Sequence, residues 1–507
     1  MRHPVASAAA VLAAALAPAV AGAQTWAVEA GVGTELMWTS NAELGLPGGR
    51  NDTTLDIRSH VSVHSQGRRL RVSGTAALNA ITYFNHTQPS QLQPEVDLNA
   101  RLEAVDGFLF VDGGVRAQQT TQNPFGALPE GGTTQNTLTT TQARLSPFIE
   151  GTTSGSQVHY LLRSDSSWTQ DSGAGSATAT ASAARGYFGR QTVMFERDPR
   201  PLGWRFEAER SDTRYDDDTQ DPVVLQLARL SVNYALGDEF SAGVHAGREH
   251  NDLADRLTQG NIYGVQARWA PSPRTTFTAF EEKRFFGKSW RLGFDHRRPQ
   301  FTWNAVVSRS LDTTPQSLFD LPATNNVAGL LDSMFTTRFP DPIERGRAVR
   351  DFIDNQGLPA STLRPINLYA QRLSIVTLRS VTLGLIGRRN TATLTAFQSR
   401  TEDALESGAL ASGTALTNNT QYGASASLTH RLTPTMALNT SVDWTRIQAL
   451  QAVGTERTTR RTARLRLNVQ TTPTTNAFAG VRYRDLDSNV AVEGREGAVF
   501  VGMDHTF

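Results

Sequence analysis

Hydrophobic and polar residues alternate with a period of two along most of the chain, most clearly between residues 261 and 310. In the segments YGVQARW (263–269) and WRLGFD (290–295), every second side chain is apolar or aromatic. A period of two is typical of extended strands with one apolar and one polar face. The runs are separated by Pro271 and Pro273, by Gly287-Lys288 and by Pro299. Proline and glycine at these points predict turns between adjacent antiparallel strands.

The length of the runs distinguishes a membrane barrel from a soluble sandwich. Most runs reach about 10 residues or more, the length that a tilted strand needs to cross a bilayer, whereas strands of soluble proteins average about 5 to 6 residues. Aromatic residues lie near the predicted strand ends, at Tyr263, Trp269, Phe285, Phe286, Trp290 and Trp303. Such rings are typical of the two headgroup layers of a membrane. We therefore predict a transmembrane barrel, with a soluble all-β sandwich as the alternative.

Short turns and long polar loops alternate along the chain. Short turns are predicted at Gln66-Gly67, Asp106-Gly107 and Gly237-Asp238, and long loops at 41–52, 120–137, 169–181, 215–222, 401–419 and 485–496. Outer-membrane barrels have short periplasmic turns and long extracellular loops. One strand between each turn and loop gives an antiparallel up-and-down all-β barrel of about 22 strands, within a range of about 18 to 24, over residues 24–507. An even number places both termini on the periplasmic side.

The first 23 residues have the features of a secretory signal peptide. Arg2 and His3 precede an Ala/Val/Leu-rich run that ends in Ala21-Gly22-Ala23. This pattern predicts cleavage after Ala23. A membrane helix is the alternative, but the run is short and contains Pro18. Because strand alternation begins directly after this segment, no separate plug domain is expected before the barrel.

Composition fits an envelope protein with an alternating pattern. The mean hydropathy of -0.35 is too polar for a helical membrane protein, and the net charge of +1 gives no indication of a nucleic-acid partner. The absence of cysteine excludes disulfides and Cys-ligated metals. We predict a protein of the Gram-negative outer membrane that contacts outer-membrane lipids and lipopolysaccharide.

The last segment, GAVFVGMDHTF, places alternate residues on one face up to the terminal Phe507. It resembles the C-terminal signature of bacterial outer-membrane barrels. In that group a terminal aromatic residue on an alternating strand is read by the barrel-assembly machinery, so the resemblance implies that Phe507 is an assembly signal. His505 departs from the usual apolar residue at its position.

A second resemblance covers nearly the whole chain after the signal segment. It is carried by WAPSPRT (269–275), RFFGKSW (284–290), the Arg297-Arg298 turn and FPDPIERGRAVRDFIDNQGLP (339–359), and more weakly by TSNAELG (39–45) and YRDLDSN (483–489). These motifs resemble uncharacterised outer-membrane barrels associated with PEP-CTERM and exosortase loci. The resemblance implies a barrel that occurs with exopolysaccharide production genes, with an exopolysaccharide and its export proteins as partners.

Alternation stops between residues 311 and 366, where two helical patterns are predicted instead. One apolar face would contain Val327, Leu330, Leu331 and Met334, and the other Val349, Phe352 and Ile353. The second helix has Asp341 as a possible N-cap, Pro342 at the first position and Gly357 after its end. A loop of this length with its own apolar faces indicates either a plug or lid of the lumen or an extracellular cap.

Motifs for chemistry are scarce. The chain has no Gly-x-Ser-x-Gly elbow, no His-Glu-x-x-His and no phosphate-binding loop. His60 and His64 would lie about 13 Å apart on one strand face, too far to share a zinc ion. Asp216, Asp217, Asp218 and Asp221 could hold a divalent cation that bridges lipopolysaccharide, but a solvated acidic loop is the favoured interpretation. We therefore predict no catalytic residue, no metal site and no cofactor.

Arginines lie in the phase opposite to the apolar residues, which predicts that they face the lumen. In the central strands, Arg205, Arg268 and Arg291 have Glu207, Glu209 and Asp295 as possible partners, which favours a structural ladder. Toward the C-terminus only Glu456, Asp485 and Asp487 are close in sequence to the arginines Arg446, Arg457, Arg460, Arg461, Arg464, Arg466, Arg482 and Arg484. This sector is predicted to be positive, with Arg464, Arg466, Arg482 and Arg484 lining a path for anions.

Three functions remain open from the sequence. The first is a conduit or secretion component for an exopolysaccharide, favoured by the resemblance and by the basic sector. The second is a structural or assembly barrel with a closed lumen, which the helical insert allows. The third is an outer-membrane hydrolase, which is disfavoured because no nucleophile constellation is visible. We expect a protein that is not an enzyme.

Overall fold

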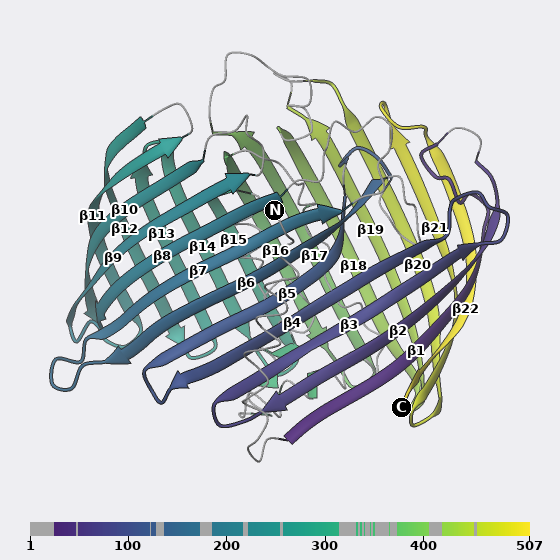
Figure 1. Ribbon diagram of the computed structural model, residues 1–507, viewed down its shortest axis with the longest axis horizontal. Coiled ribbons are helices and arrows are strands. Elements are labelled where there is room, and N and C mark those ends of the chain that lie inside the picture. The colour runs from purple at the N-terminus through teal and green to yellow at the C-terminus, as the bar shows by residue number, and fades with distance from the viewer. Residues whose placement is uncertain are drawn as a thin grey trace, which may run out of the picture.

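The computed structural model describes residues 25–507 except 47–48, 122, 128–135, 173–184, 216–221, 254–256, 314–330, 333–334, 337–338, 340–344, 346–347, 350–364, 366–372, 405–417 and 451–453. The described residues form one sheet of 22 strands (Figure 1). The strands are β1 (Thr25–Thr39), β2 (Asp52–Gln66), β3 (Leu70–Tyr83), β4 (Gln91–Val105), β5 (Leu109–Thr121), β6 (Thr137–Thr152), β7 (His159–Ser172), β8 (Arg185–Arg197), β9 (Leu202–Tyr215), β10 (Val223–Leu236), β11 (Phe240–Leu253), β12 (Leu257–Ser272), β13 (Thr275–Arg284), β14 (Gly287–Arg297), β15 (Phe301–Thr313), β16 (Leu373–Ile386), β17 (Asn390–Asp403), β18 (Asn419–Thr433), β19 (Met436–Ala449), β20 (Arg457–Thr472), β21 (Thr475–Ser488) and β22 (Gly494–Thr506).

The sheet closes on itself as a barrel. Each strand pairs antiparallel with its neighbours in sequence, and β22 pairs with β1 from Thr39↔Ala498 to Gly31↔Thr506. Closure leaves no strand edge for pairing with another molecule, which is how membrane barrels satisfy all backbone groups. The predicted all-β, antiparallel up-and-down barrel of 22 strands is confirmed.

The two ends of the barrel differ, and we call them the turn rim and the loop rim. The turn rim carries the short connections from even-numbered to odd-numbered strands, together with the start of β1 and the end of β22. Gly107 and Gly237 lie in two of these turns with φ of 61° and 74°, a left-handed conformation that glycine adopts without strain. The predicted turns at these glycines, and the placement of both ends of the barrel chain on one rim, are confirmed.

The outer face carries the apolar phase of the alternation. Tyr263, Val265 and Trp269 of β12 are 54%, 57% and 47% exposed, although all three are hydrophobic. Exposed aromatic side chains follow the turn rim (Trp26, Tyr234, Trp269, Trp303) and the loop side of the wall (Trp38, Tyr263, Tyr483). An apolar belt between two aromatic girdles is the surface that an outer-membrane barrel presents to lipid. The fold is that of an outer-membrane β-barrel.

The hairpin β13–β14 is the lowest point of the loop rim. Its strands have only 10 and 11 residues, and Arg284 pairs directly with Gly287 across a turn at Phe285 and Phe286. The prediction of a turn at Gly287-Lys288 is therefore wrong by two residues. Gly287 instead begins β14 with φ of 103°, which closes the tight turn.

Beyond the tip of this short hairpin, the loop-rim ends of other strands contact one another across the barrel. The Oγ1 atoms of Thr213, at the end of β9, and Thr313, at the end of β15, lie 3.5 Å apart. Buried Val223, Leu253 and Leu373, from β10, β11 and β16, form one apolar cluster beside them. These contacts join strands that are far apart around the sheet, so the loop rim is drawn together on this side of the barrel.

Candidate functional site in the barrel lumen

A first belt of ion pairs crosses the inner wall from β4 to β8. Asp112 accepts hydrogen bonds from Arg101 at 2.7 Å and from Arg163 at 3.2 Å. Arg163 also contacts Asp165 at 2.7 Å, and Arg190 contacts the second oxygen of Asp165 at 3.3 Å. Because these contacts link β4 to β5, β5 to β7 and β7 to β8, the belt ties several strands of the wall together.

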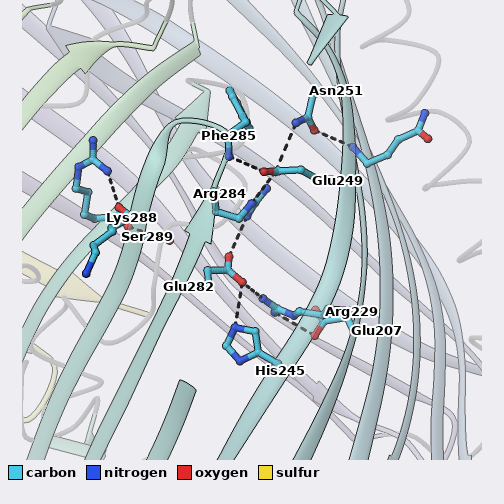
Figure 2. A network of polar contacts seen from close by, with 12 residues as sticks. Glu207, Arg229, His245, Glu249, Asn251, Glu282, Arg284, Phe285, Lys288 and Ser289 are labelled. Carbon is cyan, nitrogen blue, oxygen red and sulfur yellow. Dashed lines mark hydrogen bonds and ion pairs between the residues drawn. The ribbon is translucent and has the colours of Figure 1, made fainter. Parts of the chain in front are cut away.

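A second belt crosses β9 to β13 (Figure 2). Arg229 lies 3.2 Å from Glu207 and 2.9 Å from Glu282, and Arg284 lies 3.1 Å from Glu282 and 2.8 Å from Glu249. Glu249 and Glu282 are 1% and 2% exposed, so these charges are almost completely removed from water. Buried charges require such pairing, because an unpaired one carries a large desolvation penalty.

Glycine in β12 allows the second belt to form. A Cβ atom at Gly264 would lie 2.5 Å from Nε2 of His245 and 2.0 Å from the carbonyl oxygen of Glu281. Without that Cβ, the His245 ring stacks on Phe280 at 5.0 Å and its Nε2 lies 3.5 Å from Glu282. Side chains of β11 and β13 therefore meet across β12.

The predicted structural ladder in the central strands is present, with partners only partly as expected. Arg205 lies 3.2 Å from Glu207, as predicted, whereas Asp295 accepts a hydrogen bond from Asn304 at 2.6 Å. His245, Glu249 and Glu282 were not singled out from the sequence. Their position in the polar phase of GVHAGRE (243–249) and FEEKR (280–284) is the only signal that the sequence offers.

The second belt predicts a stability difference between two adjacent glutamates. Replacing Glu282 with alanine removes the shared partner of two buried arginines and should lower the free energy of unfolding by about 3 kcal/mol. Glu281 faces outward, its side chain is 49% exposed, and it pairs with Lys288. Replacing Glu281 with alanine should leave the free energy of unfolding nearly unchanged. Denaturant titration of both variants in detergent checks this, and equal effects would show that the belt is not a brace.

Arg482 and Arg484 face the lumen from β21 and share one carboxylate. Glu496 of β22 lies 2.6 Å from Arg482 and 3.1 Å from Arg484, and it accepts a third hydrogen bond from Thr39 at 2.8 Å. The arginine side chains are 4% and 7% exposed. Two positive charges and one negative charge are thus fixed at this point of the wall.

Arg464 and Arg466 project from β20 onto aromatic rings. The guanidinium of Arg464 lies 4.8 Å from the Phe500 ring, and that of Arg466 lies 3.7 Å from the Phe478 ring. Arg466 is also 3.6 Å from Asp504, whereas within the described part of the chain no carboxylate is paired with Arg464. Arginine stacked on an aromatic face keeps its charge while part of its shell of water is removed.

The expected shortage of acids in this sector is only partly correct. Glu496 and Asp504 of β22 are partners that were missed, because the register of β21 with β22 brings them to the arginines from a distant part of the sequence. Alternation also places Arg446, Arg457 and Arg461 in the outward phase, and Arg461 pairs there with Asp485. The anion path along Arg464, Arg466, Arg482 and Arg484 remains a prediction.

Loops fold over this sector from the loop rim. Arg460 of β20 donates hydrogen bonds to the carbonyl oxygens of Pro124 and Gly126, and Thr458 donates to that of Phe125 at 2.7 Å. Leu486 of β21 packs in one cluster with Leu44 and Ala127. Parts of the β1–β2 and β5–β6 connections therefore rest on the inner wall, and we call residues 41–46 and 123–127 the loop lid.

An ion pair stabilises the first of these loops outside the membrane. Arg50 donates two hydrogen bonds to Glu43, at 2.9 Å and 2.7 Å. These bonds hold the pKa of Glu43 below its usual value. The carboxylate therefore keeps its charge to lower pH than an ordinary glutamate, and the ion pair holds the loop folded back on itself.

The connection between β15 and β16 contains the predicted helical segments. Leu331, Asp332 and Phe335 are helical in the first, and Arg345, Ala348 and Val349 in the second. Leu331 and Val349 are 1% and 3% exposed, and Arg345 joins the segments through a 2.8 Å contact with Asp332. The other predicted face and cap residues, Val327, Leu330, Met334, Phe352, Ile353, Asp341, Pro342 and Gly357, lie outside the described residues.

One contact places this insert relative to the rims. Thr336 accepts a hydrogen bond at 3.3 Å from Nη1 of Arg297, the last residue of β14, which lies at the turn rim. The insert leaves β15 at Thr313 and returns at Leu373, both at the loop rim. With 13 residues in β15, the wall between the rims is about 40 Å long along the strand at 3.3 Å per residue. Thr336 is therefore at the opposite end of the barrel from both ends of the insert.

Phe507 lies at the turn rim beside the closing strand pair. Its backbone N–H donates to the carbonyl oxygen of Ala30 at 2.8 Å. The residue is 78% exposed, and the centroid of its ring lies 4.9 Å from that of the His505 ring. The exposed ring is available to another protein during assembly, and the role of Phe507 as an assembly signal stays a prediction.

Deletion of Phe507 should slow or abolish insertion into the outer membrane while secretion continues. The reason is the loss of the terminal aromatic together with the last backbone hydrogen bond. The fraction of heat-modifiable protein in outer-membrane preparations measures insertion. Phe507→Tyr, which keeps the ring and the chain length, is the control and should insert normally; normal insertion of the deletion would contradict the role.

Within the described residues, no group of three or more His, Asp or Glu side chains is arranged to hold a metal ion, and no helix is long and apolar enough to cross a membrane. The acidic loop with Asp216, Asp217, Asp218 and Asp221 lies outside those residues.

No protein-family model matches the chain, and no curated protein is similar to it in sequence. Among solved structures, the siderophore receptor PirA from Pseudomonas aeruginosa is similar with 10% identity and a TM-score of 0.45, covering 94% of this chain and 80% of that one. The FrpB iron transporter from Neisseria meningitidis is similar with 11% identity and a TM-score of 0.49, covering 94% and 81%. The likeness concerns the fold, and iron or siderophore transport is a property of those proteins.

Proposed function

We propose that the chain is an outer-membrane conduit whose lumen is partly filled by the β15–β16 insert, of which the structure describes residues 331–332, 335–336, 339, 345, 348–349 and 365. The observation that carries this proposal is the hydrogen bond between Thr336 and Arg297, because the insert reaches the turn rim although both of its ends lie at the loop rim. A segment that connects the two rims inside lipid has the lumen as its path, since the outer face of the barrel is apolar.

The arginine sector gives the conduit its preference for anions. Arg482 and Arg484 share the single carboxylate of Glu496, and Arg464 has an aromatic ring as its described partner. In a confined lumen with little water, uncompensated positive charge lowers the barrier for an anionic solute. The same wall opposes cations of similar size.

The cargo that we propose is an acidic exopolysaccharide, or a component that is exported with it. This step is supported by the resemblance to exosortase-associated barrels through segments such as RFFGKSW and WAPSPRT. Deletion of the gene should reduce surface polysaccharide, and the full-length chain should restore it. A normal amount of surface polysaccharide in the deletion strain would exclude this cargo. Conductance measurements would still test the conduit itself.

A structural or assembly barrel with a closed lumen is the second candidate. It is favoured by the loop lid, held by Arg460 and Thr458, and by the contact between Thr213 and Thr313 that draws the loop rim together. Planar-bilayer recordings distinguish the two: a conduit produces discrete conductance steps when the insert is removed, whereas a closed barrel remains silent.

A further inference from the structure

The two lysines of the chain form a pair on one hairpin. Lys283 and Lys288 are the only lysines among 507 residues, and they are directly opposed in the β13–β14 ladder. Lys288 is 73% exposed, and Lys283 is also exposed. Every other basic residue in the chain is arginine or histidine, so two lysines at facing positions of one hairpin are a distinct local feature.

Both lysines lie on the outer face of the barrel. Along β13 the side chains alternate, with Glu282 buried in the second belt and the neighbouring Glu281 and Lys283 exposed. Lys288 lies in the same outward phase of β14 as the exposed Leu292. The lysines therefore project away from the lumen, toward the layer that surrounds the barrel.

Their height on the wall corresponds to the lipid headgroups. Below them, Val265, Leu292 and Val381 form part of the exposed apolar belt on β12, β14 and β16. The belt ends in the aromatic girdle at Tyr263, whose ring lies 5.5 Å from Nζ of Lys283. An aromatic girdle marks the boundary of the hydrocarbon layer, and lysines beside it extend their ammonium groups into the headgroups.

One arginine extends the positive surface along the same rim. Arg309 of β15 donates to the carbonyl oxygen of Lys288, and its guanidinium lies 5.5 Å from the Phe286 ring. Among the described contacts of this group, the acid is Glu281, 2.6 Å from Lys288. Three cations against one carboxylate leave the surface positive; we call Lys283, Lys288 and Arg309 the lysine patch.

We propose that the lysine patch binds the phosphorylated sugar headgroup of an outer-leaflet glycolipid of the lipid A class. Phosphate accepts charge-assisted hydrogen bonds from ammonium and guanidinium groups, and the patch offers both kinds of donor at headgroup height. The acyl chains of the same lipid would cover the apolar belt directly below. The strands of the hairpin β13–β14 have only 10 and 11 residues, so its turn ends close to the height of the headgroups.

Amine footprinting tests the site directly, because the chain has only two side-chain amines. The full-length barrel in detergent is acetylated with an amine-reactive reagent in the presence of diphosphoryl lipid A, its dephosphorylated form or phosphatidylglycerol. Diphosphoryl lipid A should protect both lysines in peptide mass spectra, and the other two lipids should not. Equal protection by phosphatidylglycerol would replace the glycolipid site with a general anionic surface, and no protection would overturn the proposal.

Binding measured by native mass spectrometry supplies an independent readout. Lys283→Gln with Lys288→Gln should weaken diphosphoryl lipid A binding about 10-fold, as expected for losing two charge-assisted contacts. The arginine pair Lys283→Arg and Lys288→Arg should bind within about threefold of the parent, because the charge and donors remain. Arg461→Gln with Arg495→Gln is the matched control: these outward arginines share Asp485 elsewhere on the rim. An equal loss in that control would contradict a localised site.

Discussion

Replacing residues 315–359 with a short Gly/Ser loop should raise the single-channel conductance of the barrel several-fold. A barrel of 22 strands is wide enough to need a filled lumen if it is not to leak. Both ends of the insert lie at the loop rim, and its residue Thr336 contacts Arg297 at the turn rim. Its removal should therefore open a path that the wall itself leaves free.

The measurement is conductance in planar bilayers, with heat-modifiable migration as the check that the shortened chain still folds. The wall strands are paired continuously from β1 to β22, so the deletion should not prevent barrel closure. If the shortened barrel folds and conducts like the parent, the insert is a cap on the lumen or the loop lid is sufficient to close it. Removing residues 123–127 in addition then separates these two explanations.

Substituting the lumen arginines in the insert-deleted barrel should move its ion selectivity away from anions. Arg464→Gln with Arg466→Gln removes the two charges that lie over Phe500 and Phe478. The anion-to-cation permeability ratio should fall roughly twofold or more. Adding Arg482→Gln and Arg484→Gln should lower it further, because Glu496 then carries an unpaired negative charge in the wall.

Reversal potentials under a salt gradient measure this ratio. Arg461→Gln with Arg495→Gln is again the matched control, since it removes two charges from the outer face of the same sector, on β20 and β22. The control should leave the reversal potential unchanged. If the inner and outer substitutions act alike, or if neither acts, the arginines brace the wall and do not line the path.

Alternation was sufficient to predict the wall of this barrel. Tyr263, Val265 and Trp269 have the period and the apolar character that expose them to lipid, and glycine at 107 and 237 marks tight turns. These signals are local, because a strand and a turn are each defined by a few adjacent residues. The strand number followed from counting such segments.

The pairing of the charges could not be predicted in the same way. Glu496 contacts Arg482 and Arg484 only because β22 pairs with β21 in one register, and a shift by one residue would send its side chain outward. The sequence pattern groups Arg461 with the lumen arginines, but the register of β20 with β21 places it beside Asp485 on the outer face. The loop lid gave no signal at all, since Arg460 binds backbone carbonyl groups that every residue possesses.

Labelling of a single cysteine at position 336 tests most directly whether the insert lies within the barrel. The chain contains no cysteine, so Thr336→Cys gives one thiol without background. A bulky, membrane-impermeant maleimide added to intact cells should leave this cysteine unmodified. Once the outer membrane is permeabilised, the same reagent reaches the periplasmic end of the barrel and should label the cysteine. Rapid labelling on intact cells would place residue 336 outside the cell and contradict an insert that reaches the turn rim.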